Sequence, residues 1–411
     1  MVNLRRAAIF LISLVPFAAG AFVQSEGSEA NASRSEKSTG IPGKYIITLK
    51  EGTTDATTAS HLAWVQNVHK RSLDGRNLKG VEKTYKAARF RAYAGEFDDA
   101  TIEQIRNHPE VEYVEPDQIF RITAVASQQE AEWGLGTLSS RTPGSKIYTY
   151  DSSAGKGGYA YIIDTGLFNQ HPEFNDGRAQ LGQNFVPFTR FVDNAGHGTH
   201  VAGTIGGKTY GVAKAATLVS VKVLDNEETD GSIVLQGLQW AIRDIVDKGR
   251  LGKSVINMSL GGNRLYALNA LVRTAYDAGI PVVAAAGNDD TLASQSSPGS
   301  QPNAITVGAI DENWEEAWFS NYGRTVDILA PGVNILSAWR QVNATGPNTL
   351  TLNGTSMAAP HITGLSVYLM IAENITTPDA LTARLKALGT KNKAKKLKYE
   401  TPNLIAYNGI A

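Results

Sequence analysis

Residues 354–360 read Gly-Thr-Ser-Met-Ala-Ala-Pro, and they decide how the rest of the chain is interpreted. A serine hydroxyl is a useful nucleophile only when a base takes its proton and a carboxylate orients that base. Two upstream glycine-rich turns supply such partners, because Asp164 ends an apolar run and His197 is the second residue of the segment Gly-His-Gly-Thr-His-Val-Ala-Gly at 196–203. Asp164, His197 and Ser356 therefore form a candidate catalytic triad.

Short apolar strands alternate with longer helical patterns after Trp133. We expect strands at 159–163, 217–223, 254–258, 281–286 and 304–308, and helices at 200–206, 232–247, 265–277 and 356–373. Such alternation predicts a parallel sheet covered by helices on both faces.

The candidate residues fall where such a sheet binds its ligands, beyond the carboxyl ends of the strands. Asp164, Asn288 and the segment 259–262 follow strands, whereas His197 and Ser356 begin helices, whose free N–H groups favour negative charge. Each residue alone has an ordinary interpretation, as a turn residue or a helix cap. Those interpretations do not explain why all of them occur in these flanks, so we expect one shared catalytic rim.

Other chemistries fit less well. An aspartic protease needs two carboxylates in one site, and no second Asp-Thr-Gly or Asp-Ser-Gly is present. His197 and His200 could share a metal, but no His-Glu-x-x-His motif or third ligand accompanies them. No Gly-x-Ser-x-Gly turn indicates a lipase or esterase.

An upstream segment reads as a separate small α+β unit. We expect strands at 45–49, 90–97 and 111–114 and helices at 61–72 and 100–107, followed by a loose polar segment at 121–132.

Composition limits the remaining possibilities. With 411 residues, 42% of them hydrophobic, the chain can form two folded units, and its formal net charge of +0 gives no indication of a nucleic-acid partner. Arg5 and Arg6 precede an apolar run at 7–19 that is too short for a bilayer, which needs about 20 residues, so residues 1–20 are expected to be a secretory signal rather than a membrane anchor. The chain has no cysteine, which excludes disulfides and thiolate sites.

From Trp133 onward the chain resembles the subtilisin family of serine proteases (subtilases), and most of all its secreted proteinase K-like fungal branch. The three motifs above carry this resemblance, together with His-Pro-Glu-Phe at 171–174 and Phe-Ser-Asn-Tyr-Gly at 319–323. The resemblance implies a doubly wound parallel sheet flanked by helices and an extracellular endopeptidase. It makes Ser356 the nucleophile, His197 the general base and Asp164 its orienting partner.

The same resemblance assigns the remaining site residues. The Asn288 amide and the Ser356 N–H would form the oxyanion hole. Two edge segments would flank an extended peptide, which adds to them as a strand: Ser259, Leu260, Gly261 and Gly262, and Asp230, Gly231 and Ser232. Ala284, Ala285 and Ala286 would line the pocket for the residue before the cleaved bond, predicting broad specificity for apolar or aromatic residues. The glycines could instead be plain turn residues.

The upstream unit resembles the inhibitory propeptide of this family. We expect a propeptide at 21–123 with a ferredoxin-like inhibitory domain at about 44–120, self-cleavage between Thr123 and Ala124, and a monomeric peptidase at 124–411. The propeptide would assist folding and then block the cleft with its C-terminal strand, keeping the site blocked until secretion. A permanent second domain is the alternative.

No cofactor is expected for the chemistry. A structural calcium ion could be held by Asp327 with the carbonyls of Pro302 and Ala304. Asn31, Asn343 and Asn374 are the favoured glycosylation sites among the Asn-x-Ser/Thr sequons.

A non-enzymatic alternative is a catalytically silent binding protein with this fold. Silent relatives lose a triad residue or the oxyanion asparagine, and this chain retains all four residues.

Overall fold

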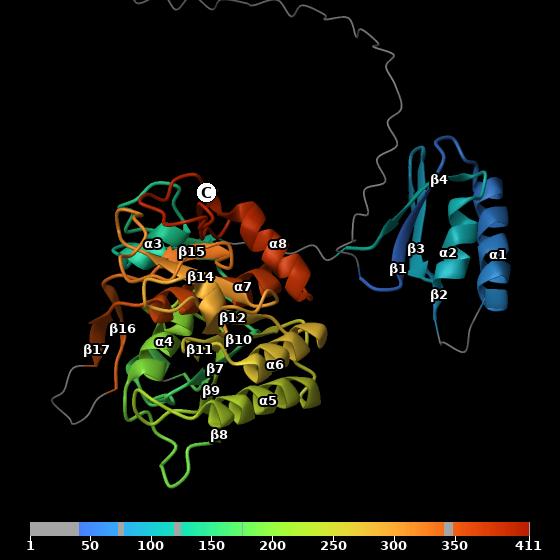
Figure 1. Cartoon of the computed structure of the whole chain (residues 1–411). Helices are drawn as coiled ribbons and strands as arrows, with labels where there is room; N and C mark the ends of the chain where they lie inside the picture. Colours follow the sequence, from blue (N-terminus) through green and yellow to red (C-terminus); the bar gives the residue numbers. More distant parts are fainter. Residues whose placement is uncertain (1–40, 73–77, 119–124, 175, 341–347, 411) are drawn as a thin grey trace, which may run out of the picture. The chain divides into compact units, whose positions relative to one another are not determined.

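The structure is a computed structural model that describes residues 41–72, 78–118, 125–174, 176–340 and 348–410 (Figure 1). It divides into two compact units between Asp117 and Gln118. The expected signal segment, the Thr123/Ala124 cleavage site and the sequons at Asn31 and Asn343 lie outside the described residues.

The first unit is a four-stranded antiparallel sheet, in the order β2-β3-β1-β4, with α1 and α2 side by side on one face (Figure 1). Its elements are β1 (Lys44–Leu49), α1 (Asp55–Ser72), β2 (Gly80–Ala87), β3 (Phe90–Glu96), α2 (Asp99–Arg106) and β4 (Val111–Pro116). The core contains Ile47, Val65 and Tyr93, each at most 1% exposed. This β-α-β-β-α-β order confirms the expected ferredoxin-like α+β fold.

Strand β2 was not expected from the sequence. Its first residue is buried but its last six are exposed, since it is the edge strand of the sheet. An exposed edge strand carries charged residues such as Lys83 and Lys86 and shows little apolar alternation.

The second unit is built on a nine-stranded sheet in the order β18-β19-β15-β14-β12-β10-β7-β9-β8, parallel except for the β18–β19 pair. The strands are β7 (Tyr159–Asp164), β8 (Ala179–Asn184), β9 (Thr217–Lys222), β10 (Ser254–Met258), β12 (Val282–Ala285), β14 (Ile305–Ile310), β15 (Ile328–Pro331), β18 (Thr390–Lys391) and β19 (Leu404–Ile405). This architecture confirms the doubly wound α/β prediction.

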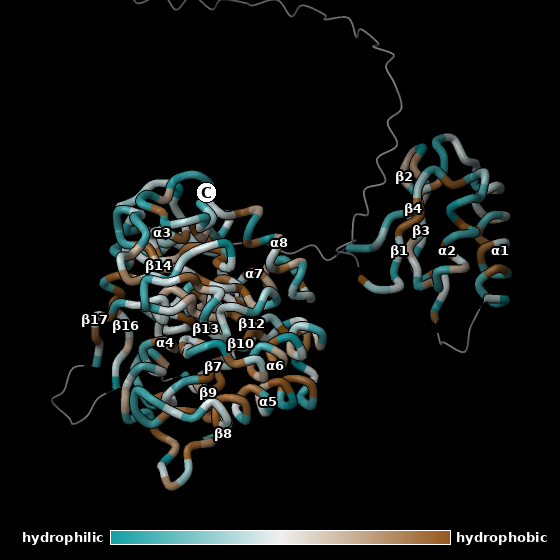
Figure 2. Tube along the Cα trace, in the orientation of Figure 1, coloured by the Kyte–Doolittle hydropathy of each residue, from teal (hydrophilic) through white to brown (hydrophobic). Residues whose placement is uncertain are grey.

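Helices cover both faces of this sheet. They are α3 (Trp133–Leu138), α4 (His197–Gly206), α5 (Gly231–Asp247), α6 (Tyr266–Asp277), α7 (Thr355–Glu373) and α8 (Pro378–Leu388). Successive residues of β7 point to opposite faces, so Ala160 and Ile162 belong to one buried cluster with residues of α4, α7 and α8, whereas Tyr161 and Ile163 belong to another with residues of α5 and α6. Burial on both faces explains why these strands are mainly apolar without strict alternation, and Figure 2 shows brown segments near β7 and β9.

Smaller pairings complete the unit. They are β5 (Val125–Gln128) with β6 (Tyr148–Asp151), β11 (Gly262–Asn263) with β13 (Ser296–Ser297), and β16 (Ile335–Ala338) with β17 (Thr349–Leu352), besides the 3-10 turns Pro172–Phe174 and Ala293–Gln295. The expectation of a loose segment at 121–132 was wrong for β5, whose partly exposed residues form an antiparallel pair with β6.

Among the helices that the structure describes, none is long and apolar enough to cross a membrane.

Candidate active site

Asp164 ends strand β7 with its side chain only 1% exposed. Its Oδ1 accepts hydrogen bonds from the Thr165 N–H and from His197 Nδ1, both at 2.8 Å. Oδ2 is buried and has no hydrogen-bond partner among the described residues. Two bonds on one oxygen therefore hold the carboxylate against the imidazole.

His197 is the first residue of helix α4, preceded by Gly196 in a left-handed conformation with φ of 94°. A Cβ on Gly196 would lie 2.7 Å from the Trp339 ring, so the turn requires glycine. Because Nδ1 is bonded to Asp164, Nε2 is the nitrogen left to exchange a proton. Burial lowers the pKa of His197, but the charge and hydrogen bond of Asp164 and the charge of Asp193 outweigh it, so that the pKa is raised above its usual value.

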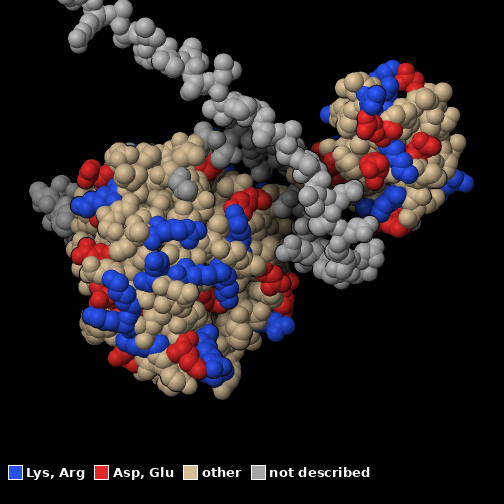
Figure 3. Space-filling model, turned by 90° about the horizontal axis from the view of Figure 1, so that it is seen from above, with Lys and Arg blue, Asp and Glu red and all other residues tan. Residues whose placement is uncertain are grey.

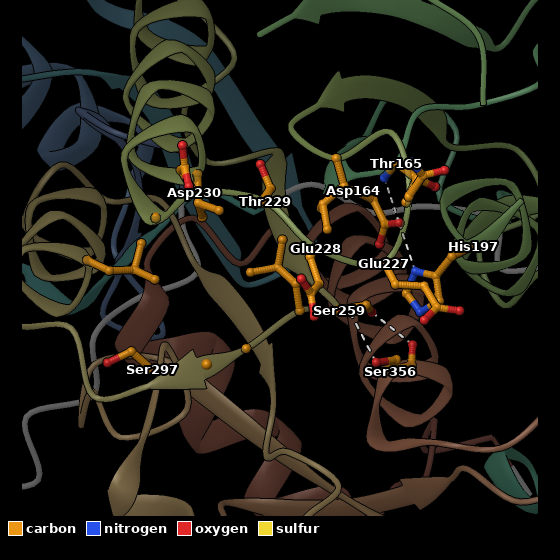
Figure 4. A pocket seen from close by; sticks show the side chains of 18 of the residues that line it. Asp164, Thr165, His197, Glu227, Glu228, Thr229, Asp230, Ser259, Ser297 and Ser356 are labelled. Atoms are coloured by element: carbon orange, nitrogen blue, oxygen red, sulfur yellow. Dashed lines mark hydrogen bonds and ion pairs between the residues drawn. The ribbon is translucent and has the colours of Figure 1, made fainter. Parts of the chain in front are cut away.

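Ser356 is the second residue of helix α7. Its Oγ donates to the Ser259 carbonyl at 3.1 Å, and Ser259 Oγ donates in return to the Ser356 carbonyl at 2.8 Å. That carbonyl is free because its helical partner would be residue 360, and Pro360 has no N–H. His197 and Ser356 line one cavity, drawn in Figure 4, and the Ser356 hydroxyl must rotate from Ser259 to reach the imidazole.

Asn288 is held through its side-chain oxygen. Oδ1 accepts from the N–H and from the hydroxyl of Thr355, both at 2.8 Å. The amide nitrogen is thereby left to donate, beside Ser356 at a second cavity of about 550 Å³ that both residues line. This is the arrangement that an oxyanion hole requires.

Asn321 shapes the loop that carries Asn288. Its Nδ2 donates to the Ala286 carbonyl at 3.0 Å, and its Oδ1 accepts from the N–H groups of Asp289 and Thr291 at 3.0 Å. A Cβ on Gly287, which has φ of 105°, would come within 2.2 Å of that amide. The sequence indicated Asn321 only as part of the motif at 319–323.

Asp193 was missed from the sequence. Its carboxylate, on a residue 6% exposed, accepts from the Thr165 hydroxyl, the Gly196 N–H and the Thr199 N–H, all at 2.8 Å, and also from the Thr199 hydroxyl. It thus caps α4 just before His197 and joins that helix to the turn after Asp164. No pattern marks it, because an aspartate in a polar loop is common.

Lys222 was also missed, and its side chain is 0% exposed. Its ammonium donates to the carbonyls of Thr165 at 2.7 Å and Leu224 at 2.9 Å and lies 2.8 Å from the Asp225 carboxylate. It therefore ties the end of β7 to the loop that leads into α5.

The two predicted edge segments meet at one cavity of about 1230 Å³ that Asp164, His197 and Ser356 also line. It contains all seven of the predicted residues of those segments: Asp230, Gly231, Ser232, Ser259, Leu260, Gly261 and Gly262. Further lining residues that the sequence did not indicate include Trp339, Glu227 and Glu228.

Of the three alanines predicted to line one pocket wall, only one does so. Ala285 lines the cavity of about 550 Å³, whereas Ala284 and Ala286 are 0% exposed, do not line it, and pack into the hydrophobic core. Residues of a strand alternate between faces, so three in a row cannot share one wall.

The residues proposed for calcium do not fit that ion. Asp327 accepts the Thr306 N–H on Oδ2 at 2.9 Å and the Lys386 ammonium on Oδ1 at 2.8 Å. Pro302 and Ala304 are absent from the cavity beside Asp327, which Lys386 and other cationic side chains line. Within the described ranges no three His, Cys, Asp or Glu side chains gather as a metal site. A cation already satisfies Asp327, so we derive no role for calcium.

The other histidines of this region have structural bonds. His200 Nε2 lies 3.0 Å from the carbonyls of Ile335 and Leu350, and His361 Nδ1 lies 2.8 Å from the Met357 carbonyl. Burial lowers the pKa of both His200 and His361 to about 4, so both rings are neutral at physiological pH.

Two surface features complete the comparison with the sequence. The sequence is rich in lysine at 391–398, and two of these lysines have acidic partners: Lys396 pairs with Glu315 at 2.6 Å and Lys398 with Asp290 at 2.5 Å. Basic and acidic side chains also share the face drawn in Figure 3. Asn374 is exposed at the end of α7, where a glycan could be attached.

Comparisons with known proteins agree with this geometry. The Subtilase family model matches residues 155–405, and the Peptidase inhibitor I9 model matches residues 44–123. Alkaline protease 1 of Emericella nidulans is 49% identical, with 100% of this chain and 99% of that protein covered. Subtilisin-like proteinase Mp1 of Magnaporthiopsis poae is 48% identical over 100% of both chains.

A solved structure is also similar. It is the crystal structure of a cold adapted subtilisin-like serine proteinase, which matches with a TM-score of 0.63 and 39% identity over 68% of this chain and 99% of the other. The chain therefore belongs to the subtilase family of serine proteases and carries an N-terminal inhibitor I9 propeptide domain.

Proposed function

We propose that the protein is a secreted serine endopeptidase, made as a self-cleaving zymogen, that hydrolyses proteins with broad specificity. The observation that carries this proposal is the Asp164–His197 hydrogen bond of 2.8 Å at a cavity that Ser356 shares. The oriented Asn288 amide beside Ser356 supports it.

The chemistry follows from these positions. Ser356 Oγ attacks the peptide carbonyl carbon while His197 Nε2 takes the hydroxyl proton, and Asp164 stabilises the imidazolium. The Asn288 amide and the Ser356 N–H donate to the oxyanion. The imidazolium then protonates the leaving amine as the C–N bond breaks, which gives an acyl-enzyme, and water activated by His197 hydrolyses this ester.

Substrate binding is proposed as strand addition between 259–262 and 230–232. Backbone hydrogen bonds provide affinity without strict sequence choice. The cavity of about 550 Å³ beside Asn288 has Ala285 on its wall and would take the residue before the cleaved bond. Its modest volume and small wall residue favour an apolar or aromatic side chain there.

Residues 1–20 are proposed to direct export and to be removed as the signal. The first unit is then removed as the propeptide by cleavage between Thr123 and Ala124. The match of residues 44–123 to the inhibitor I9 family supports this role. The remaining peptidase, 124–411, is proposed to act as a monomer, with glycans at Asn374 and Asn343; any glycan at Asn31 would leave with the propeptide.

The test is the size and activity of Ser356→Ala. Wild type should mature to a form about 120 residues shorter than the encoded chain, because residues 1–123 are removed. Ser356→Ala should stay unprocessed, and it should lose kcat by about 10⁶-fold, the loss measured for this kind of change in the related enzyme subtilisin. Ser366→Ala is the matched control, since Ser366 Oγ is buried in the same helix without a hydrogen-bond partner.

Three outcomes separate the possibilities. Normal maturation and cleavage by Ser356→Ala would refute the triad assignment. A wild-type chain that neither matures nor cleaves casein would favour a silent binding protein. An active enzyme that loses its signal segment but keeps the first unit would favour a permanent second domain.

A further inference from the structure

Three carboxylates line the substrate cavity on the loop between β9 and α5. We call Glu227, Glu228 and Asp230 the acidic wall; all three residues are exposed and border the cavity of about 1230 Å³ with His197. Figure 4 labels all three among the side chains that line this cavity, together with His197, Ser259 and Ser356. The acidic wall therefore shares one cavity with the reacting groups.

None of these charges is neutralised by the described residues. Glu227, Glu228 and Asp230 take part in no ion pair there, and Asp230 accepts no capping hydrogen bond although it precedes α5. The neighbouring Asp225 differs, because Lys222 and Asn194 bond its carboxylate, and the hydrogen bond from Lys222 lowers its pKa. The acidic wall is thus available to a substrate.

The opposite charge is scarce in this cavity. Arg264 is the cationic residue among those lining it, and its guanidinium lies over the Tyr266 ring at 5.3 Å from the centroid. Asp164, the remaining carboxylate of the cavity, is bonded to His197. A substrate that enters therefore meets a net negative surface.

The rest of the cavity lining is largely apolar, and it includes Leu224, Leu235, Leu260 and Leu265. Lysine and arginine side chains suit such a surface, because their methylene stems pack on apolar groups while the charged head reaches a carboxylate. Aspartate and glutamate would be repelled, and norleucine would gain only the apolar contact.

We propose that Glu227 and Glu228 select lysine or arginine in the substrate. The selected residue lies near the cleaved bond but is not the one directly before it, because that side chain is assigned to the separate cavity beside Asn288. The inference rests on the proposed endopeptidase function and deepens it, since it names a substrate class: extended segments with a cationic side chain next to an apolar cleavage site.

The test uses the mature enzyme and a set of internally quenched peptides. Each peptide keeps one apolar residue before the cleaved bond and places lysine, norleucine or glutamate at one neighbouring position at a time. The readout is the ratio of kcat/KM for lysine over norleucine, at low and at 0.5 M salt. We expect a ratio of roughly two to five per engaged carboxylate at one position or more, falling at high salt.

The variants are Glu227→Gln, Glu228→Gln and the pair together. Each single change should reduce the ratio and the double change should bring it close to one, whereas Glu312→Gln should leave it unchanged. Glu312 is the matched control because it is exposed and borders neither cavity at the active site. Using a ratio cancels any general loss of folding or activity.

Two results would overturn the inference: no position at which lysine exceeds norleucine, or a preference that survives both the double change and high salt. Cleavage of none of the peptides by wild type would instead overturn the proposed function, so the two failures are distinguishable.

Discussion

Replacing Asp193 by asparagine tests how the structure positions the candidate base. Asp193 Oδ1 accepts from Thr165 and Gly196, and Oδ2 accepts from the N–H and hydroxyl of Thr199. An asparagine keeps one acceptor oxygen but puts an NH₂ group where Oδ2 stood. The Thr199 N–H, on a residue 0% exposed, then faces a donor and loses its partner.

The expected loss of stability can be summed from these contacts. A buried N–H left unpaired costs about 1–3 kcal/mol. Loss of the negative charge at the start of α4 costs about 0.3–1 kcal/mol more. The total of about 1–4 kcal/mol corresponds to a fall in Tm of roughly 2–10 °C for a unit of this size.

The same change should move the pH profile. Burial lowers the pKa of His197, while the charges of Asp164 and Asp193 raise it to a net value above the usual one. Removing the negative charge of Asp193 should therefore lower the pKa of His197. His197 must be unprotonated to act as the base, so the pH dependence of activity follows this pKa. The acid limb of kcat/KM should then shift to lower pH.

Two assays check this prediction. Thermal unfolding is measured in a Ser356→Ala background, which prevents self-digestion, and the pH profile is measured in the active enzyme. Asp247→Asn is the control, an exposed aspartate at the end of α5 whose loss should change stability by less than about 0.5 kcal/mol. Unchanged Tm, or an acid limb that stays in place or moves to higher pH, would refute the reasoning.

Two further predictions concern groups away from the triad. His61 lies 3.0 Å from the Tyr93 hydroxyl and 3.2 Å from His108 Nδ1, and burial, then the charge of His108, lowers its pKa to about 4. The unfolded chain protonates this histidine from pH ~6.5 downward, so the first unit should lose up to about 3 kcal/mol of stability between pH ~6.5 and ~4. Hydrogen exchange of the β1 and β3 amides should show this loss in Ser356→Ala and a weaker pH dependence in Ser356→Ala/His61→Gln. Equal pH dependence in the two variants would contradict the prediction. For Asp327, any gain in Tm from millimolar calcium should be the same in wild type and Asp327→Asn, because Lys386 already satisfies that carboxylate; a gain lost only in the variant would show that calcium does bind there.

The sequence was most informative where one pattern is enough to define an element. Strand β10 was predicted at its observed bounds, because Val255, Ile256 and Met258 form a short, mainly apolar segment of the kind expected for a strand buried on both faces. Helix α4 was expected to begin at 200 but begins at His197, because the capping bonds come from Asp193, which no local pattern marks.

The sequence was least informative where partners come from distant segments. The Lys386 ammonium reaches Asp327 across 59 positions, so the sequence could not show that a cation was already present. Strand β5 is defined by its pairing with β6 rather than by its own hydrophobicity. The sequence also could not show which acidic residues of the loop before α5 have a cationic partner. In the structure Lys222 pairs with Asp225, and the residues of the acidic wall have no such ion pair among the described residues.

The seven residues 354–360 are decisive because their backbone has several separate roles. Thr355 holds the Asn288 oxygen across 67 positions and so turns the amide nitrogen toward the second cavity. Pro360, lacking an N–H, frees the Ser356 carbonyl for the Ser259 hydroxyl across 97 positions. A serine that only capped a helix would need neither the threonine before it nor the proline after it. The motif therefore connects the proposed nucleophile, the proposed oxyanion donor and the proposed substrate edge, which is why it indicates a protease more strongly than any one of its residues.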